Sequence, residues 1–309
     1  MQTYLPTTDL LFRKMLTAPD SLHILKAFVK DLLGIEFQSL KPRETYHIET
    51  YKHFYEKNKR AGVFHTEVDI LAVAEDGSHT TIECQVRSHP HFIERVTYYL
   101  AEAFRASYGN LTASGDKKDN HYSSLRPAYG INIMDFHLFD ENQKALKRFH
   151  LLDEETHAPL YLEKNKELLI LCFLSLVNEN IEAHSPAWHW QYFLATGEVT
   201  DSAPDYIKEA KVKTDFANLK REEQKMIMDI EKAKAIHGAE LSGARLEGRK
   251  EGRQMGREEG LQLGREEGKK GKERELALKF LKIGNTLEQV SEVTGLDIET
   301  LKRLEREQE

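Results

Sequence analysis

The chain has 309 residues, of which 40% are hydrophobic, enough to bury a sizeable core in one large domain or two smaller ones. Its net charge of −7 excludes a protein that binds nucleic acid through overall positive charge, so any contact with DNA needs a local basic surface or a metal ion. The two cysteines, Cys84 and Cys172, lie far apart in apolar runs, a pattern that indicates neither a disulfide framework nor a zinc site.

The sequence shows no membrane or export signal. The first sixteen residues lack the apolar stretch of a signal peptide. The longest apolar run, residues 168–177, is well short of the ~20 residues that a membrane span requires. We therefore expect a soluble, cytoplasmic protein with no membrane partner.

Two helices are predicted at the start of the chain. Asp9 is expected to cap a short helix that runs through Phe12 and Met15. A second helix follows Ser21, because apolar residues keep helical spacing over 22–33, and Gly34 is a typical stop for it.

The most informative stretch is 67–86, which predicts a β-hairpin. Two runs with period-two alternation flank an Asp76-Gly77 turn signal. Two loops fit this sequence. A two-residue loop pairs Asp69 with Cys84, whereas a three-residue loop, with the glycine in the left-handed conformation, pairs Asp69 with Glu83.

The rest of the first 200 residues predicts further α/β elements. The period is helical over 92–108, polar residues over 110–126 indicate a loop, and 128–136 is typical of a buried strand. Residues 160–177 are expected to form a short extended piece and then an apolar helix. This order predicts an α/β fold with a mixed sheet flanked by helices.

Beyond residue 204 the composition becomes strongly charged. We predict a domain over 1–204 and a charged helical arm over 205–275, in which glycine recurs every fourth residue from Gly248 to Gly268. A small helical tail is expected over 276–309. The glycine stripe would allow another helix to approach closely, which makes a homo-oligomer one expectation and a solvated helix the other. The tail has the pattern of a helix-turn-helix or of a packing hairpin.

The hairpin carries the candidate chemistry. Phosphodiester cleavage needs an activated water and stabilisation of negative charge, which Mg²⁺ ions held by carboxylates supply. Glu83 and Gln85 share one face of their strand, and only the three-residue loop brings Asp69 to that face. The alternative is a solvated face without function, but both strands are apolar, and a carboxylate in such a strand is costly unless it is paired or metal-bound.

These residues carry a resemblance to a known family. The order Asp9-x-x-Phe12, VDI, DG, IECQ, and then Arg95 with Tyr98-Tyr99 on the next helix, resembles the PD-(D/E)XK nuclease family transposases, which include the Rpn recombination-promoting nucleases. The resemblance covers roughly residues 5 to 180. It implies a restriction-endonuclease-like α/β fold and a Mg²⁺-dependent DNA endonuclease, with Mn²⁺ as an alternative metal.

The resemblance also implies roles for single residues. Asp69 and Glu83 would ligate the metal, with the backbone carbonyl of Cys84 as a further ligand. Gln85 stands where the wider superfamily has lysine, and it would hydrogen-bond the attacking water without bringing a charge.

Three other residues are expected near this site. Asp9 would lie close to it, and Arg95 and Tyr98 would face the phosphate. The alternative for Arg95 is a salt bridge to Glu94, Glu102 or the sheet, and for Tyr98 a packing role.

Two other functions remain open. A nucleic-acid-binding or partner-binding protein on the same fold would explain the absence of lysine at position 85. An oligomeric scaffold organised by the arm would leave the hairpin residues without a purpose. His89 and His91 flank Pro90 beside the hairpin, and we interpret them as bystanders rather than metal ligands.

Overall fold

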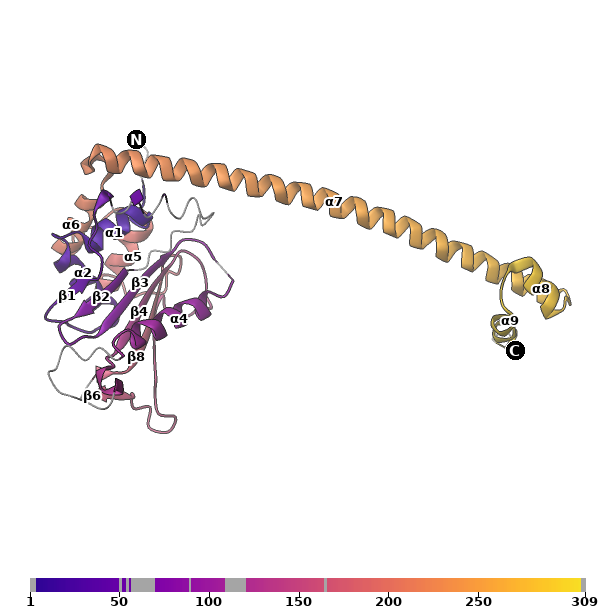
Figure 1. Ribbon diagram of the computed structural model, residues 1–309, viewed down its shortest axis with the longest axis horizontal. Coiled ribbons are helices and arrows are strands. Elements are labelled where there is room, and N and C mark those ends of the chain that lie inside the picture. The colour runs from indigo at the N-terminus through magenta and orange to yellow at the C-terminus, as the bar shows by residue number, and fades with distance from the viewer. Residues whose placement is uncertain are drawn as a thin grey trace. The chain divides into compact units, whose positions relative to one another are not determined.

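A mixed β-sheet lies at the centre of the first part of the chain (Figure 1). The computed structural model describes residues 4–49, 52–53, 56, 70–88, 90–108, 121–163 and 166–306. Within these residues the sheet has six strands, in the order β1 (Leu40–Pro42), β2 (Ile70–Ala74), β3 (His79–Gln85), β4 (Ala128–Met134), β8 (Leu169–Ser175) and β5 (Leu146–His150). The pairs β3–β4 and β4–β8 are parallel and the other pairs are antiparallel. The predicted mixed sheet is confirmed.

Helices cover both faces of the sheet (Figure 1). One face is covered by α2 (Leu22–Leu33), which packs against α1 (Asp9–Thr17), α5 (Pro186–Thr196) and α6 (Asp205–Thr214). The other face is covered by α4 (Phe92–Arg105), which contacts β3, β4 and β8. A short separate hairpin consists of β6 (Tyr161–Glu163) and β7 (Lys166–Glu167), and two 3₁₀ turns cover His121–Ser124 and Phe216–Asn218.

The main core lies between the sheet and the α2 layer. Ile82, Ile131 and Cys172 are neighbours on three adjacent strands and are fully buried. Against them pack the aromatic rings of Phe28 and Trp190, which meet edge to face with their centroids 4.9 Å apart. This packing fixes β3 at the centre of the sheet.

The first two helices begin and end close to the predicted positions. Asp9 is the first residue of α1, where a carboxylate is favoured by the helix dipole. Ser21 occupies the N-cap position of α2, although its side chain makes no capping hydrogen bond. Gly34 ends α2 with a φ of 78°, the left-handed conformation that favours glycine.

The hairpin between β2 and β3 has the three-residue loop. Ile70 pairs with Ile82 and Val73 with His79. The Ala74 N–H donates to the Ser78 carbonyl at 2.9 Å, so Glu75, Asp76 and Gly77 form the loop. Gly77 has a φ of 82°, as the three-residue loop requires. The expected pairing of Asp69 with Glu83 requires this loop length, and Asp69 itself lies outside the described residues.

Replacing Gly77 tests how strongly this turn fixes the hairpin. An added Cβ would meet the Cγ of Arg126 at 3.2 Å, and a left-handed backbone costs a non-glycine residue about 1–2 kcal/mol. We expect Gly77→Ala to lower the free energy of unfolding by about that amount in urea denaturation. Gly77→Asn should lose less, since asparagine tolerates this conformation. Equal stability of Gly77→Ala and the unmodified protein would contradict the assignment.

One predicted element is wrong. The apolar helix expected within 160–177 is the strand β8, which lies between β4 and β5. A short apolar run has no period that separates a buried strand from a buried helix. Pairing within the sheet makes this segment a strand, because β4 and β5 bind its two edges. Both of its faces are packed, and an apolar run is typical of such a strand.

The compact unit that contains the sheet runs to Glu231, beyond the boundary predicted at residue 204. Ile207 and Ala210 of α6 are fully buried in the main core. The next helix is α7 (Arg221–Lys282), and Ile227 and Ile230 in its first turns are buried in a second cluster. Residues after 204 therefore help to build the first unit.

The second unit covers Lys232–Glu309. Its small core joins the end of α7 to α8 (Leu287–Thr294) and α9 (Ile298–Arg306) through Ala277, Val290, Leu301 and Leu304. A capping box at Thr286 begins α8 and Gly295 ends it. The expected charged helix and helical tail are both present, whereas self-association through the glycine stripe stays a prediction. Among the described residues, no helix is long and apolar enough to cross a membrane.

Candidate functional site

Glu83 and Gln85 lie on the face of β3 that α4 covers. Glu83 is 3% exposed and Gln85 is half-buried. Both contact one guanidinium, because Nη2 of Arg95 lies 2.6 Å from Oε1 of Gln85 and 3.4 Å from Oε2 of Glu83. The Gln85 amide also donates through Nε2 to the carbonyl of Arg87 at 2.9 Å. The sequence alternative in which Arg95 pairs with the sheet is therefore the one observed.

The first turns of α4 hold Arg95 in this position. Phe92 and Val96 are buried against Met134 and Phe173 of the sheet. Arg95 is adjacent to Val96, at the border of this buried stripe, and its guanidinium carbon lies 5.4 Å from the centroid of the Phe92 ring. Its side chain is 18% exposed and that of Glu83 is 4% exposed, so the pair is largely shielded from solvent. Charges interact more strongly in such surroundings than at the surface.

The opposite face of β3 carries Cys84, close to two further carboxylates. Burial raises the pKa of the Cys84 thiol well above its usual range, and the negative charges of Asp9 and Asp135 raise it further. Cys84 alternates with Glu83, so its side chain points towards the α1–α2 layer. The thiol is therefore protonated at neutral pH and is not a nucleophile.

Asp9 lies in the helical layer, close to the Cys84 side chain of β3. It is 5% exposed, and the Nε of Arg13 lies 3.4 Å from its Oδ1. Arg13 stands four residues after Asp9 on α1, a spacing at which side chains of a helix meet. Asp9 and Arg95 thus belong to the two different layers that enclose the end of β3.

Asp135 is a candidate that the sequence reasoning missed. It directly follows β4, and its N–H donates to the carbonyl of Gln85 at 3.0 Å. Burial raises the pKa of its carboxyl. The sequence contains a signal that could have predicted this position. An aspartate directly after an apolar strand lies beside the carboxyl end of a parallel neighbouring strand.

Of the other residues considered for the site, Asp69 lies in a part of the chain that the structure does not describe, and Tyr98 lies away from Glu83. Asp69 and His89 lie outside the described residues. Tyr98 is 61% exposed, and its hydroxyl donates to Oε1 of Glu102 at 3.1 Å, so it neither packs in the core nor contacts Glu83. His91 stands at the N-cap of α4, with its ring 3.3 Å from Glu94.

The atoms at the end of β3 that could ligate a metal ion are oxygen atoms. In the part of the chain that the structure describes, no three His, Cys, Asp or Glu side chains form a metal-binding group. On the α4 face the described part offers the Glu83 carboxylate, and Asp69 directly precedes the first residue of β2. Carboxylate and carbonyl oxygens suit Mg²⁺ or Mn²⁺ rather than zinc.

The sheet, its flanking helices and the acidic hairpin define an α/β protein of nuclease-like architecture. Over residues 6–240 the chain matches the PD-(D/E)XK nuclease family transposases, and it belongs to that family. The match includes α6 and the first turns of α7, in agreement with the extent of the first unit. No curated protein matches the chain, and no solved structure does.

Proposed function

We propose that this protein is a divalent-metal-dependent DNA endonuclease whose site lies at the end of the β2–β3 hairpin. The observation that supports this most strongly is the buried Glu83 carboxylate, which shares the guanidinium of Arg95 with Gln85. A carboxylate kept out of water in the middle of a sheet is costly. Arg95 compensates this cost in the metal-free protein, and a metal site explains why a carboxylate is placed there. Membership of a nuclease family points the same way.

Glu83 and Asp69 are proposed to hold the metal, with Mg²⁺ preferred and Mn²⁺ as a substitute. The pairs Ile70–Ile82 and Leu71–Thr81 set the register, and we propose that it continues by one residue so that Asp69 lies opposite Glu83. The carbonyl of Cys84 is a further proposed ligand. When bound, the metal would activate water and stabilise negative charge on the phosphate.

Gln85 and Arg95 are proposed to divide the work of the superfamily's lysine. Each end of the Gln85 amide makes one hydrogen bond within the described residues, which leaves one N–H and one oxygen lone pair to orient a water. Arg95 supplies the positive charge that glutamine lacks, and a guanidinium is well suited to phosphate oxygens. This arrangement weakens the main argument for a protein that binds DNA without cleaving it.

The test is cleavage of a supercoiled plasmid, which has no ends and therefore reports endonuclease activity. The full chain with Mg²⁺ should convert it to nicked and linear forms, and EDTA should stop the reaction. Asp69→Ala and Glu83→Gln should each lower the rate by about 10²-fold or more, since each removes a group on which charge stabilisation depends. Lys144→Ala, at an exposed position near the far edge of the sheet, is the matched control.

The outcomes separate the alternatives. Undiminished cleavage by both Asp69→Ala and Glu83→Gln would overturn this site. Absence of cleavage by the unmodified protein with Mg²⁺ and with Mn²⁺, together with retained DNA binding, would favour the non-catalytic alternative.

A further inference from the structure

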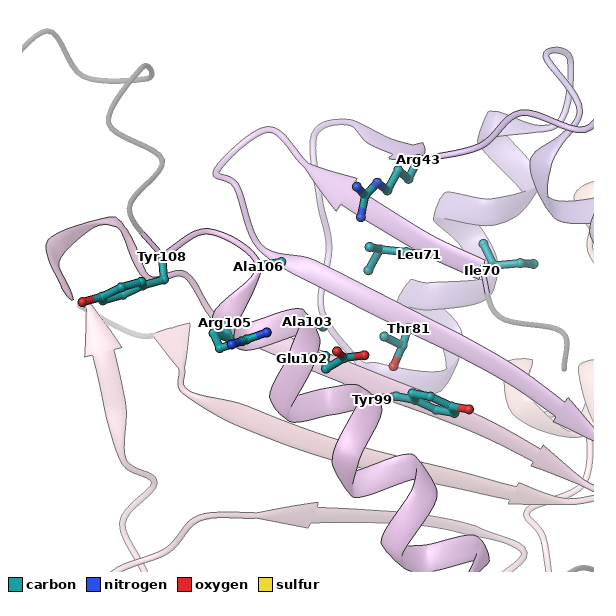
Figure 2. A pocket seen from close by; sticks show the side chains of 10 residues that line it. All are labelled: Arg43, Ile70, Leu71, Thr81, Tyr99, Glu102, Ala103, Arg105, Ala106 and Tyr108. Atoms are coloured by element: carbon teal, nitrogen blue, oxygen red, sulfur yellow. The ribbon is translucent and has the colours of Figure 1, made fainter. Parts of the chain in front are cut away.

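A pocket opens beside the candidate site, between the β2–β3 hairpin and α4 (Figure 2). Its volume is about 520 Å³, within the range of sites for small organic ligands. Figure 2 shows Arg43, Leu71 and Thr81 on the strand side and Tyr99 and Arg105 on the helix side. None of these residues has a part in the cleavage chemistry proposed above.

The pocket continues the face that carries the candidate site. Thr81 precedes Glu83 by two residues on β3 and therefore points to the same side of the sheet. Tyr99 lies one helical turn after Arg95 on α4. A polymer bound at Glu83 and Arg95 therefore has a neighbouring unit within reach of this pocket.

Two arginines give the pocket a positive charge. Neither Arg43 nor Arg105 forms an ion pair with any carboxylate in the described ranges. The backbone of Arg43 is anchored to the sheet, because its N–H donates to the Leu71 carbonyl at 2.7 Å. Arg105 lies in the last turn of α4, where the helix dipole favours a cation. Arg43 is not part of a helix, so the helix dipole does not explain the presence of a second cation in the pocket.

The charge of the remaining lining residues does not cancel these two. Glu102 is the carboxylate among them, and its Oε1 accepts a hydrogen bond from Tyr98. In a protein with a net charge of −7, such a pocket selects for an anion.

The walls between the arginines are apolar and aromatic. Ala103 is 4% exposed, and Leu71 and Tyr99 are half-buried. An anion flanked by a flat apolar group fits this combination, and a nucleotide has both, since its base stacks on aromatic rings while arginine binds its phosphate. A base held inside a pocket cannot remain paired with a complementary strand.

We propose that this pocket binds one unpaired nucleotide of a DNA strand, next to the phosphate that the candidate site cleaves. Arg43 and Arg105 bind the phosphate of that nucleotide, and Tyr99 with Leu71 receives its base. The inference rests on the proposed function and specifies its substrate class. The protein should prefer single-stranded or locally unpaired DNA to a continuous duplex.

The test measures DNA binding rather than cleavage. A fluorescent single-stranded oligonucleotide is titrated with the full-length protein in EDTA, and anisotropy gives the dissociation constant. Arg43→Ala and Arg105→Ala should each weaken binding about tenfold, the usual effect of losing a hydrogen bond to a charged group. Lys144→Ala, which removes one positive charge outside the pocket, should change it less than twofold, and Glu102→Gln should strengthen it.

Salt and aromatic variants identify which part of the nucleotide is bound. If both arginines share one phosphate, the double variant should reduce the slope of log affinity against log salt by about 0.7. Tyr99→Ala should weaken binding about tenfold through lost stacking, whereas Tyr99→Phe should retain it. The preference for the single strand over a duplex of the same sequence should disappear in the double arginine variant.

Several results would overturn the proposal. One is a double arginine variant that binds like Lys144→Ala, and another is an unmodified protein that binds duplex as tightly as single strand. If dTMP displaces the labelled oligonucleotide as effectively as the same concentration of unlabelled oligonucleotide does, the pocket is instead a site for free nucleotides. The binding assay contains EDTA, so its results do not depend on whether the protein cleaves DNA. If the double arginine variant still binds the oligonucleotide with unchanged affinity while the unmodified protein cleaves DNA, the pocket proposal fails and the nuclease proposal stands.

Discussion

Removal of residues 205–309 is expected to unfold the remaining chain. The sequence predicts a domain over 1–204, whereas the compact unit runs to Glu231 and includes buried residues of α6 and α7. The cut would remove Ile207 from the main core, and it would remove Ile227 and Ile230, which pack with Leu10 and Leu11 in the second cluster. The three isoleucines are between 0% and 2% exposed. Burying one such side chain contributes about 2 kcal/mol, and whole domains are stable by only about 5–15 kcal/mol.

Polar contacts would be lost with the same cut. Glu223 of α7 accepts from Nζ of Lys14 at 2.8 Å and from the hydroxyl of Tyr46 at 3.0 Å. On α6, the hydroxyl of Tyr206 donates to Asp31 at 2.8 Å. Burial raises the pKa of Asp31, and this hydrogen bond counteracts the rise. Without α6 the Asp31 carboxylate keeps the Trp190 indole as a donor but loses the Tyr206 hydroxyl.

Two fragments make the comparison. The fragment 1–240 retains all of the first unit and should unfold cooperatively on heating, as followed by circular dichroism. The fragment 1–204 should aggregate or show no cooperative transition. A cooperative transition in 1–204 at the temperature of 1–240 would show that α6 and the start of α7 add little to the core.

The hairpin was predictable because its signals are local. Alternation fixes which residues share a face, and the Asp76-Gly77 pair marks the turn. The sequence permits both loops, and only the three-residue loop would place Asp69 and Glu83 on one face for a metal site. The observed Ala74–Ser78 hydrogen bond and the φ of Gly77 confirm the three-residue loop.

The sequence is least informative where contacts with distant parts of the chain determine the structure of a segment. Residues 169–175 are a strand because β4 and β5 lie on either side, which an apolar run cannot reveal. The charged composition after residue 204 concealed a stripe of buried residues whose partners are about 200 residues earlier in α1. For Arg95, the sequence offered several carboxylates, and only the packing of α4 on the sheet selects Glu83.

Replacing Arg95 by alanine is expected to destabilise the metal-free protein substantially. The Glu83 carboxylate is almost fully buried, and Arg95 lies 3.4 Å from it. Removing one partner of a buried ion pair costs about 3 kcal/mol or more, because the remaining charge is still kept from water. Arg105→Ala is the matched control on the same helix, and its exposed side chain should contribute less than about 0.5 kcal/mol.

Added Mg²⁺ distinguishes a metal site from a purely structural ion pair. If Glu83 ligates the metal, Mg²⁺ supplies the positive charge that Arg95→Ala lacks, and saturation a hundredfold above the dissociation constant stabilises by about 2.7 kcal/mol. The thermal midpoint of Arg95→Ala should therefore rise more with Mg²⁺ than that of the unmodified protein. The double variant Glu83→Gln, Arg95→Ala should be more stable than Arg95→Ala in EDTA and should not respond to Mg²⁺. An Arg95→Ala protein that is destabilised but equally indifferent to Mg²⁺ would identify the pair as structural and place the metal elsewhere.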